Sequence, residues 1–405
     1  MLASAGIGSS DVLTKFTEFI RFSSELGCLD GREILESGEY RRRTSPSFTQ
    51  YLRSEDELRL IVGSRVLGET RYNADGKLDV IRWARPQNDG PALRALTTIR
   101  YFSQYELDAE TKLLGEGLLH ADLDYTARHS DDLCFDPWEE ESGRHYYTQL
   151  VQSVALQNGA MWVNKAGDTA RAERYLLASA KLRDRLDRHW SAQKGHYLSR
   201  LDVRNGSPDK LLDISTLLGV LHAGLVGGAH SILDPRVHAT WFALEQLFDA
   251  TYEINRDSPP GFGPAMGRYH GDVYYSGGAY YFSTLGAAEL YFRLAATVDG
   301  GARIPVSEVN APFLDQLINQ STHRGFLPSD DSQRAQLVEA LVARGDAMMA
   351  TVRRYTPASG DLSEQFDRIT GEQVSAKRLT WSYAAFLTAF AARGQIGMVR
   401  GGCSK

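Results

Sequence analysis

A short acidic stretch, Cys134 to Glu141, has the residue types that acid–base chemistry requires. Trp138 stands directly before two adjacent acids, Glu139 and Glu140. An apolar indole and a neighbouring negative charge both disfavour an ionised carboxyl, so they raise its pKa. A carboxyl that stays protonated near neutral pH can act as a general acid. The stretch therefore predicts a general acid, and the alternative is an exposed acidic turn around one core Trp.

Three further loops are rich in groups that bind a polyhydroxylated ligand. They are residues 83–90, 267–278 and 363–373, the last together with Trp381. Sugar rings present apolar faces to aromatic side chains and hydroxyl groups to acids, arginines and glutamines. Buried acids and arginines in such a site must pair with each other or with the ligand, because an unpaired buried charge is costly. These loops favour a sugar-binding site.

Each of these loops also has a purely structural interpretation. Arg85 with Asp89 would tie one loop together, and Tyr274 with its neighbour Tyr275 would pack in the core. Glu364 would be an ordinary cap ahead of the last helix. The residue types alone leave both interpretations open.

Composition excludes several classes of protein. Of 405 residues, 42% are apolar and 24% are charged, which is typical of a soluble globular protein, and the net charge of −6 argues against a nucleic-acid partner. Three cysteines and ten histidines lack metal-ligand spacing, so neither a metal nor a cofactor is expected. The most apolar run, 211–233, contains Asp213, His222 and His230, so it predicts buried helices rather than a membrane span. The first residues lack the basic and apolar regions of a signal peptide.

Hydrophobic spacing of three and four residues predicts helices along almost the whole chain. The expected helices span about 12–26, 91–105, 115–132, 147–160, 168–190, 213–224, 236–254, 278–296, 310–320, 331–353 and 376–393. The last should turn Leu379, Tyr383, Phe386, Leu387 and Phe390 inward. Alternation of the kind found in strands is scarce, and no linker is visible, so we expect a single all-α domain over residues 1–405.

Five stretches, taken together and in order, resemble the fungal glucoamylases of glycoside hydrolase family 15. The resemblance covers about residues 12–393. The matching stretches are Arg85-Pro86-Gln87-Asn88-Asp89-Gly90-Pro91, Asp136-Pro137-Trp138-Glu139-Glu140, Asp213 with Thr216-Leu217-Leu218-Gly219, Gly267-Arg268-Tyr269 with Asp272 and Tyr274-Tyr275, and Glu364-Gln365-Phe366-Asp367 with Leu379-Thr380-Trp381.

The resemblance implies an (α/α)6 toroid of twelve helices. It implies an extracellular, monomeric, inverting enzyme that releases β-D-glucose from the non-reducing ends of α-1,4-glucans such as starch. Glu139 would be the general acid and Glu364 the general base, with Gln365 placed to orient the water. The positions that would bind substrate, or support those that do, are Trp83, Arg85, Asp89, Trp138, Glu140, Arg268, Asp272, Tyr274 and Trp381.

The sequence also departs from the family pattern. The family's first helix, and a loop with an Arg-Asp pair that holds the sugar, have no counterpart, and residues 5–10 stand in that place. An N-terminally shortened member without the first helix and without a starch-binding domain is therefore expected. Two alternatives stay open: a catalytically impaired glucan-binding relic, and a related glycosidase that acts on α-1,6-glucan or trehalose.

Overall fold

The structure is a computed structural model that describes residues 9–203, 206–256 and 258–396. Two compact units account for these residues. The N-terminal unit comprises residues 9–187 and 200–203, and the C-terminal unit comprises residues 188–199, 206–256 and 258–396. The expectation of a single domain stays a prediction.

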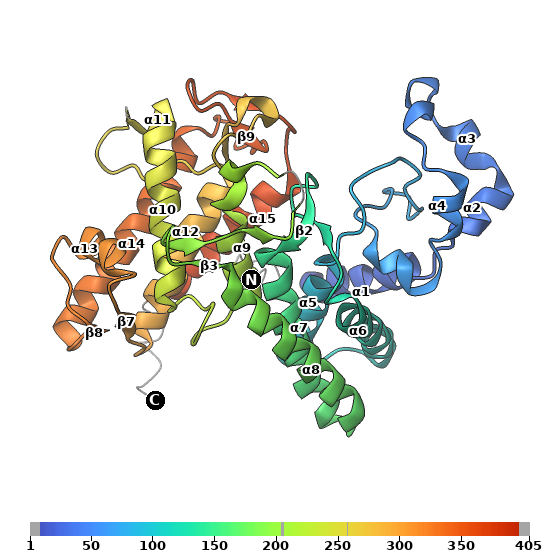
Figure 1. The fold of residues 1–405 in the computed structure, drawn as a ribbon, viewed down its shortest axis with the longest axis horizontal. Coiled ribbons are helices and arrows are strands. Elements are labelled where there is room, and N and C mark those ends of the chain that lie inside the picture. The colour runs from blue at the N-terminus through green and yellow to red at the C-terminus, as the bar shows by residue number, and fades with distance from the viewer. Residues whose placement is uncertain (1–8, 204–205, 257, 397–405) are drawn as a thin grey trace. The chain divides into compact units, whose positions relative to one another are not determined.

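The N-terminal unit is built from helices of very different length (Figure 1). Its helices are α1 (Ser9–Leu26), α2 (Gly31–Ser37), α3 (Glu39–Arg43), α4 (Glu55–Arg59), α5 (Gly90–Gln104), α6 (Ala109–His129), α7 (Tyr146–Lys165) and α8 (Thr169–Leu186). Short 3-10 helices cover Pro46–Tyr51 and Gly63–Gly68. Its strands are β1 (Cys134–Phe135), β2 (Ser142–His145) and β5 (Arg200–Leu201), in the order β1-β2-β5.

The C-terminal unit holds the remaining long helices. They are α9 (Ser215–Ala223), α10 (Pro235–Thr251), α11 (Glu253–Arg256), α12 (Tyr281–Asp299), α13 (Ala311–Ile318), α14 (Asp331–Arg354) and α15 (Thr380–Gln395). Its strands are β3 (Trp190–Ser191), β4 (His196–Tyr197), β6 (Ala279–Tyr280), β7 (Ile304–Val306), β8 (Gly325–Leu327), β9 (Gln365–Phe366) and β10 (Gln373–Val374). They form the pairs β3-β4 and β7-β8 and the sheet β10-β9-β6.

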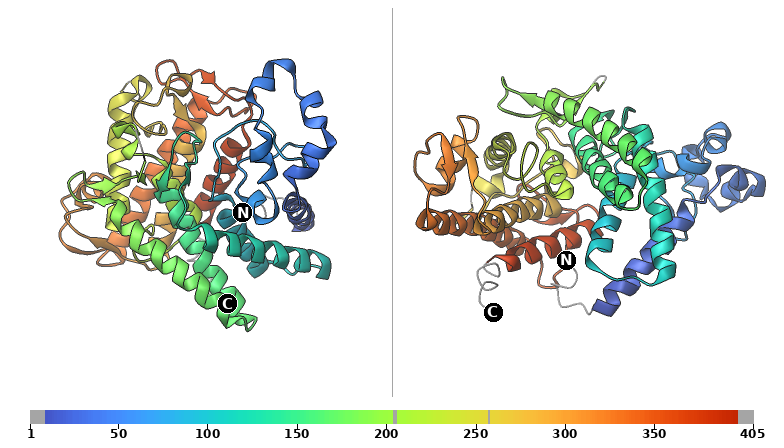
Figure 2. Two further views of the ribbon diagram at one scale, coloured as in Figure 1. Left: turned by 45° about the vertical axis from the view of Figure 1, so that its right-hand side comes forward. Right: turned by 90° about the horizontal axis from the view of Figure 1, so that it is seen from below.

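One helix in each unit is buried along most of its length. In the N-terminal unit α7 packs against α5, α6 and α8, and α7 and α8 lie side by side in Figures 1 and 2. In the C-terminal unit α12 packs against α9, α14 and α15. Both helices carry apolar residues around most of their circumference, as a helix surrounded by others must. A side chain at Gly159 of α7 would come within 2.5 Å of Leu123 on α6, so this glycine sets the close approach of the two helices.

Acidic N-caps begin several of these helices. The carboxylates of Asp108, Asp168, Asp234 and Asp330 accept a hydrogen bond from a backbone N–H in the first turn of α6, α8, α10 and α14 respectively. This satisfies donors that an α-helix leaves unpaired at its N-terminus. Three of these helices, α8, α10 and α14, begin within one residue of their expected positions, whereas α6 begins six residues earlier than expected.

The predicted helices are confirmed, and one detail of the last helix is wrong. Phe386 and Phe390 of α15 were expected to point inward, yet their side chains are 38% and 55% exposed. The buried residues of α15 are small, namely Ser382, Ala389, Ala391 and Ala392. Small side chains let α15 approach α12 closely, so the two phenylalanines are left at the surface.

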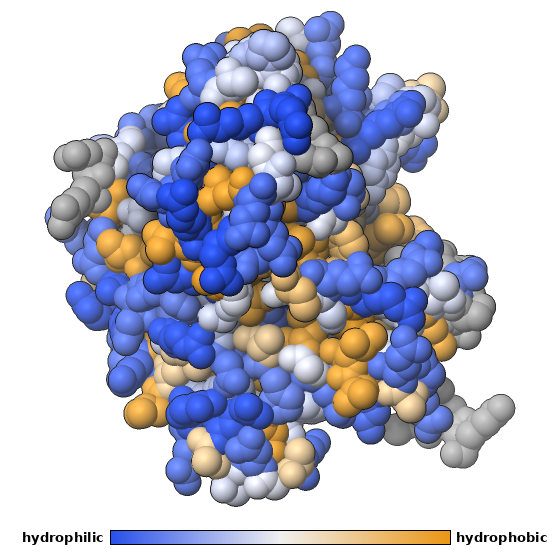
Figure 3. All heavy atoms as spheres, turned by 90° about the vertical axis from the view of Figure 1, so that its right-hand side faces the viewer, coloured by the Kyte–Doolittle hydropathy of each residue, from blue (hydrophilic) through white to orange (hydrophobic). Residues whose placement is uncertain are grey.

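The surface mixes polar and apolar residues, and Figure 3 shows several groups of apolar residues among hydrophilic ones on the face that it draws. Exposed apolar residues occur singly or in small groups on most folded proteins. Within the described residues, no helix combines the length and the apolar character needed to cross a bilayer.

Candidate active site

Glu139 lies in the loop of a short hairpin. Cys134 pairs with Gly143 and Phe135 with Ser142, so residues 136–141 form the connection between β1 and β2. The buried carboxylate of Asp136 accepts hydrogen bonds from the backbone N–H groups of Glu140 (2.7 Å) and Glu141 (3.0 Å). Such bonds fix a turn, because they satisfy backbone donors from inside the loop. The sequence pattern missed this hairpin because strands of two and four residues are too short to show alternation.

The backbone of Glu139 is held in an uncommon conformation. Its φ angle is 62°, in the left-handed region that residues with a Cβ seldom occupy. Its N–H donates to the carbonyl of Asp136 (2.9 Å), and the Asp136 N–H donates to the carbonyl of Glu141 (3.1 Å). Left-handed residues of this kind persist where the surrounding contacts enforce them, and they are frequent in functional sites. The loop therefore aims the Glu139 side chain in a fixed direction.

The half-buried Glu139 carboxyl receives a hydrogen bond from Trp83, whose Nε1–H donates to Oε2. Burial raises the pKa of Glu139 above its ordinary value, and the charge of Asp136 adds to this effect. The Trp83 hydrogen bond, Arg71 and Arg85 oppose the rise. The raised pKa predicted for Glu139 is thus found, and burial is its largest cause. Such a carboxyl suits the role of a proton donor.

The other two residues of the acidic stretch lie differently. Trp138 is half-buried, and Glu140 is exposed. The alternative of a fully exposed acidic turn does not describe Glu139, since its carboxyl is partly shielded and hydrogen-bonded.

Asp89 is a second carboxyl with a raised pKa in the same neighbourhood. It occupies the N-cap position of α5, and only 9% of it is exposed. Burial raises the pKa of Asp89 to about 6, against the opposing effect of the backbone N–H groups of Asp89 and Gly90. The negative charges of Glu139 and Asp136 raise it further. Asp89, Asp136 and Glu139 are therefore electrostatically coupled, so a change in one will alter the proton affinity of the others.

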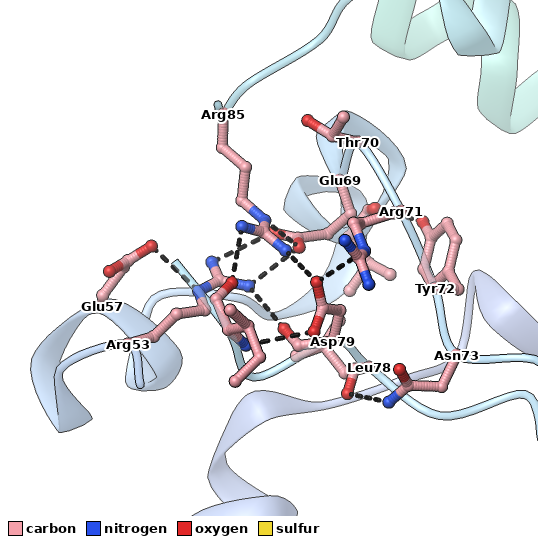
Figure 4. A network of polar contacts seen from close by, with 12 residues as sticks. Arg53, Glu57, Glu69, Thr70, Arg71, Tyr72, Asn73, Leu78, Asp79 and Arg85 are labelled. Atoms are coloured by element: carbon pink, nitrogen blue, oxygen red, sulfur yellow. Dashed lines mark hydrogen bonds and ion pairs between the residues drawn. The ribbon is translucent and has the colours of Figure 1, made fainter. Parts of the chain in front are cut away.

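Arg85 belongs to a buried network of ion pairs, which Figure 4 shows. Its Nε lies 2.6 Å from Oε2 of Glu69, and its Nη2 lies 3.1 Å from Oδ2 of Asp79. The Glu69 carboxylate is also paired with Arg53 (2.8 Å). The alternative that Arg85 ties its loop through Asp89 is wrong, because its carboxylate partners are Glu69 and Asp79. Arg85 is positioned to stiffen the segment that carries Trp83.

Glu364 lies at the start of the central strand of the small sheet in the C-terminal unit. It directly precedes β9, whose Gln365 pairs with Tyr280 of β6 and Val374 of β10. The Glu364 N–H donates to the carbonyl of Ala376 (2.7 Å), and its carboxylate Oε2 accepts a hydrogen bond from Ser375 Oγ. The alternative of a helix cap is wrong, since Leu379 occupies the N-cap position of α15.

Gln365 does not present its amide to a water. It is fully buried, its Nε2 donates to the hydroxyl of Tyr280 (3.0 Å), and its Oε1 accepts from the N–H of Gly278 (3.2 Å). Both ends of the amide are occupied by the sheet. The expectation that Gln365 orients the attacking water is therefore wrong, and the residue instead fixes the strand that follows Glu364.

Arg268 and Asp272 form a buried ion pair. Two guanidinium nitrogens of Arg268 lie 2.7 Å and 2.6 Å from the two carboxylate oxygens of Asp272. Asp272 also accepts from the N–H of Tyr274 (2.9 Å) and from the hydroxyl of Tyr280 (3.2 Å). Two parallel hydrogen bonds of this kind fix the orientation of both the guanidinium and the carboxylate. The ion pair therefore holds the loop that carries Tyr274 and Tyr275.

Two aromatic site candidates reach the surface in different ways. Tyr274 and Tyr275 are 45% and 56% exposed, so the alternative that they pack in the core is wrong. Trp381 is half-buried and stacks parallel to the buried ring of Phe282, with centroids 4.0 Å apart. Exposed or half-buried aromatic faces are what a sugar ring stacks on.

Four residues that contact site candidates carried no recognisable sequence signal. Arg71, Glu69 and Asp79 lie in an irregular segment, and Ser375 follows Glu364 by eleven positions. A cavity of about 570 Å³ in the N-terminal unit, lined by residues including Tyr40, Phe48 and Asp79, does not include Glu139.

A family model described as glycosyl hydrolases family 15 matches residues 56–391. This is well over half of the chain. The chain belongs to glycosyl hydrolase family 15. Its all-α fold is that of the family's (α/α)6 structures, so the predicted fold class is confirmed.

Named relatives and solved structures agree with this family 15 assignment. Glucoamylase 1 of Rhizopus oryzae is 31% identical over 332 residues, which are 80% of this chain and 55% of that protein. Glucoamylase-1 of Schizophyllum commune is 32% identical over 338 residues, 81% of this chain and 57% of that protein. The structure of Hormoconis resinae glucoamylase has a TM-score of 0.80 at 28% identity and covers 96% of this chain and 63% of its own. The chain thus spans a little over half the length of the curated relatives it matches.

Proposed function

We propose that this family 15 chain is an inverting exo-glucosidase that releases β-D-glucose from the non-reducing ends of α-1,4-glucans. The observation that carries the proposal is Glu139, a carboxyl with a raised pKa held in one direction by a hairpin loop. A proton donor of this kind is what cleavage of a glycosidic bond requires. Similarity to proteins named glucoamylase supports the choice of substrate.

In the proposed reaction Glu139 donates its proton to the glycosidic oxygen as the bond from that oxygen to the anomeric carbon breaks. Glu364 takes a proton from a water whose oxygen forms a new bond to the anomeric carbon from the opposite face. The configuration therefore inverts, and an α-linked glucan yields β-glucose. The mechanism requires the two carboxyl groups to stand roughly 6.5–9.5 Å apart, which stays a prediction for Glu139 and Glu364.

The other site candidates divide by their exposure. Trp83, Trp138, Glu140, Tyr274 and Trp381 are at least partly exposed, so they are proposed to contact sugar. Arg85, Asp89, Arg268 and Asp272 are largely buried or held in ion pairs, so they are proposed to support the contacting residues. A monomer that acts outside the cell is part of the same proposal.

The experiment is glucose release from maltooligosaccharides by the full chain, with the anomer followed by proton NMR. We expect β-glucose to appear first. Glu139→Gln should reduce release by at least about a hundredfold while leaving substrate binding nearly unchanged, because only the proton donor is lost. Arg59→Met, a change at an exposed ion pair, is the matched control. A wild-type chain that releases no glucose, or that releases α-glucose first, would refute the proposal.

The linkage is tested in the same assay. Maltose, isomaltose and trehalose supplied separately should be cleaved in that order of preference if the α-1,4 assignment is correct. Faster cleavage of isomaltose or trehalose would contradict the α-1,4 assignment, but it would leave the proposed roles of Glu139 and Glu364 unchanged. Multi-angle light scattering on the same preparation tests the monomeric state.

A further inference from the structure

Trp83 reaches Glu139 from a position that packs only partly against the protein. The side chain is 47% exposed, yet its Nε1–H must point at one carboxylate oxygen of Glu139. An indole with so much free surface has several staggered rotamers open to it, and only one of them places the N–H on the carboxyl. Some other group must therefore hold the ring.

Arg71 contacts this ring. The centre of its guanidinium lies 4.8 Å from the centroid of the Trp83 ring, within the distance of a cation–π contact. The planar guanidinium also stacks on an indole in a way that a lysine ammonium does not. One face of the indole is therefore covered by a charged, flat group.

Arg71 is itself anchored to the buried network of Figure 4. Its Nε lies 3.0 Å from Oδ2 of Asp79, a carboxylate that is only 3% exposed. The same oxygen lies 3.1 Å from Arg85, and Oδ1 of Asp79 accepts from the N–H of Ile81 (3.1 Å). Asp79 is thus fixed from several sides, so Arg71 is tethered at one end and lies against Trp83 at the other.

We propose that Arg71 is a positioning residue for the proton donor: it holds Trp83 so that the indole N–H remains on Glu139. The inference rests on the proposed function, because it assigns Glu139 the role of general acid. It names a residue that neither the acidic stretch nor the predicted sugar-binding loops contain.

The charge of Arg71 gives this role a second, measurable consequence. The charged groups that act on Glu139 are Arg71, Arg85, Asp136 and Asp89. Arg71 and the Trp83 hydrogen bond both favour the ionised form of Glu139, so they lower its pKa against the effect of burial. Removing Arg71 removes the positive charge and loosens the hydrogen bond. Both losses raise the pKa of Glu139.

The test reads the indole directly and needs no turnover. The chain has six tryptophans, so a nitrogen-15 NMR spectrum of the full chain shows few indole N–H resonances. The Trp83 resonance is assigned by its loss in Trp83→Phe. Its chemical shift should follow the ionisation of Glu139, and this titration should vanish in Glu139→Gln.

The variants are Arg71→Met, Arg71→Lys and the control Arg59→Met. In Arg71→Met we expect the Trp83 titration midpoint to move to higher pH by about 0.5 to 1 pH unit, with a changed indole shift at every pH. Arg71→Lys keeps the charge without the flat stack, so its midpoint should lie between those of wild type and Arg71→Met. Arg59→Met should leave the titration midpoint and the indole chemical shift of Trp83 unchanged.

Three results would overturn the proposal: an unchanged midpoint and indole shift in Arg71→Met, a wild-type titration that survives Glu139→Gln, or an equal effect in Arg59→Met. If Arg71→Met loses its dispersed spectrum by unfolding, Arg71→Lys carries the test alone, and a wild-type midpoint and indole shift in it would overturn the proposal. In an active chain, the basic limb of kcat/KM should shift with the NMR midpoint. A chain that releases no glucose refutes the glucosidase, whereas the indole titration decides the role of Arg71 separately.

Discussion

The indole of Trp83 donates a hydrogen bond to the carboxyl of Glu139 across 56 positions of sequence. Trp83 follows an irregular segment that is stiffened by ion pairs, and Glu139 lies in the loop of a hairpin. The contact joins two stretches that the sequence pattern predicted separately. It also opposes the effect of burial on the proton affinity of Glu139. The predictions below follow from the surroundings of the two glutamates.

Replacement of Trp83 by Phe should move the basic limb of the kcat/KM profile to higher pH. The hydrogen bond from the indole stabilises the ionised form of Glu139, so its loss raises the pKa of that carboxyl and keeps the acid protonated over a wider range. The activity at the optimum should fall about tenfold, because the carboxyl is less well oriented. The matched control is Trp162→Phe, a change at a half-buried tryptophan of α7. If the basic limb of the kcat/KM profile of Trp83→Phe stays at the wild-type pH or moves to lower pH, the proposed effect of the indole hydrogen bond on the pKa of Glu139 is contradicted.

Two substitutions of Asp136 should separate its charge from its hydrogen bonds. Asp136→Asn keeps an oxygen that can accept from the N–H groups of Glu140 and Glu141, but it removes a charge that raises the pKa of Glu139. The basic limb should therefore move to lower pH with little loss of stability. Asp136→Ala also leaves two partly buried loop N–H groups without their acceptor, so it should lower the free energy of unfolding by about 1–3 kcal/mol. Thermal unfolding and pH profiles of Asp136→Asn and Asp136→Ala check both expectations. An equal loss of stability in the two variants would show that the charge of Asp136, and not its hydrogen-bond acceptor, holds the loop.

Asp89 should make the folded state less stable as the pH rises. Its pKa is about 6 in the folded chain against an ordinary value of 3.8, so the folded state binds the proton more tightly than the unfolded chain. The resulting stability is fully present below about pH 4 and is lost as pH rises through 6. Asp89→Asn cannot ionise, so it should gain up to about 3 kcal/mol over wild type at pH 7 and little at pH 4.

The measurement is the unfolding free energy of wild type and Asp89→Asn at the two pH values. Asp108→Asn serves as a comparison, because the effect of Asp108 on the unfolding free energy changes with pH in the opposite direction. Hydrogen bonds to Thr111 lower the pKa of Asp108, so its stabilising effect is present above pH 4 and is lost on acidification. A gain for Asp89→Asn that is the same at pH 4 and pH 7 would contradict the burial of an ionisable carboxyl.

Ser375 should affect turnover more than binding. Its hydroxyl donates to Oε2 of Glu364, the proposed base, and so fixes the direction of that carboxylate. Ser375→Ala should lower kcat by roughly 2–10-fold with little change in KM, because the oriented base matters only as the water attacks. Ser359→Ala is the control, since its hydroxyl bonds the exposed Asp361 instead. A rise in KM at constant kcat would assign Ser375 to sugar binding and contradict its role in orienting Glu364.

The sequence alone determined the helices and the residue types of the site. The start of α14 was predictable because its apolar spacing and its N-cap residue Asp330 are local features, whereas α6 begins six residues before its expected start near 115. Glu139 and Glu364 stood out for the same reason: an acid beside Trp138 and an acid within a polar loop are visible in a few adjacent letters. The ordered stretches around them were sufficient to indicate the family.

Only the tertiary structure decided which groups surround those two acids. Arg71, Asp79 and Ser375 come from segments without periodicity, and their roles depend on contacts between residues distant in sequence. A pair of Arg85 with Asp89 was one of two interpretations that the sequence left open, yet Arg85 bonds Glu69 and Asp79. A long side chain can reach several nearby carboxylates, and burial favours the pairing that satisfies the most charges. Such choices depend on distance and burial in three dimensions, which no local pattern encodes.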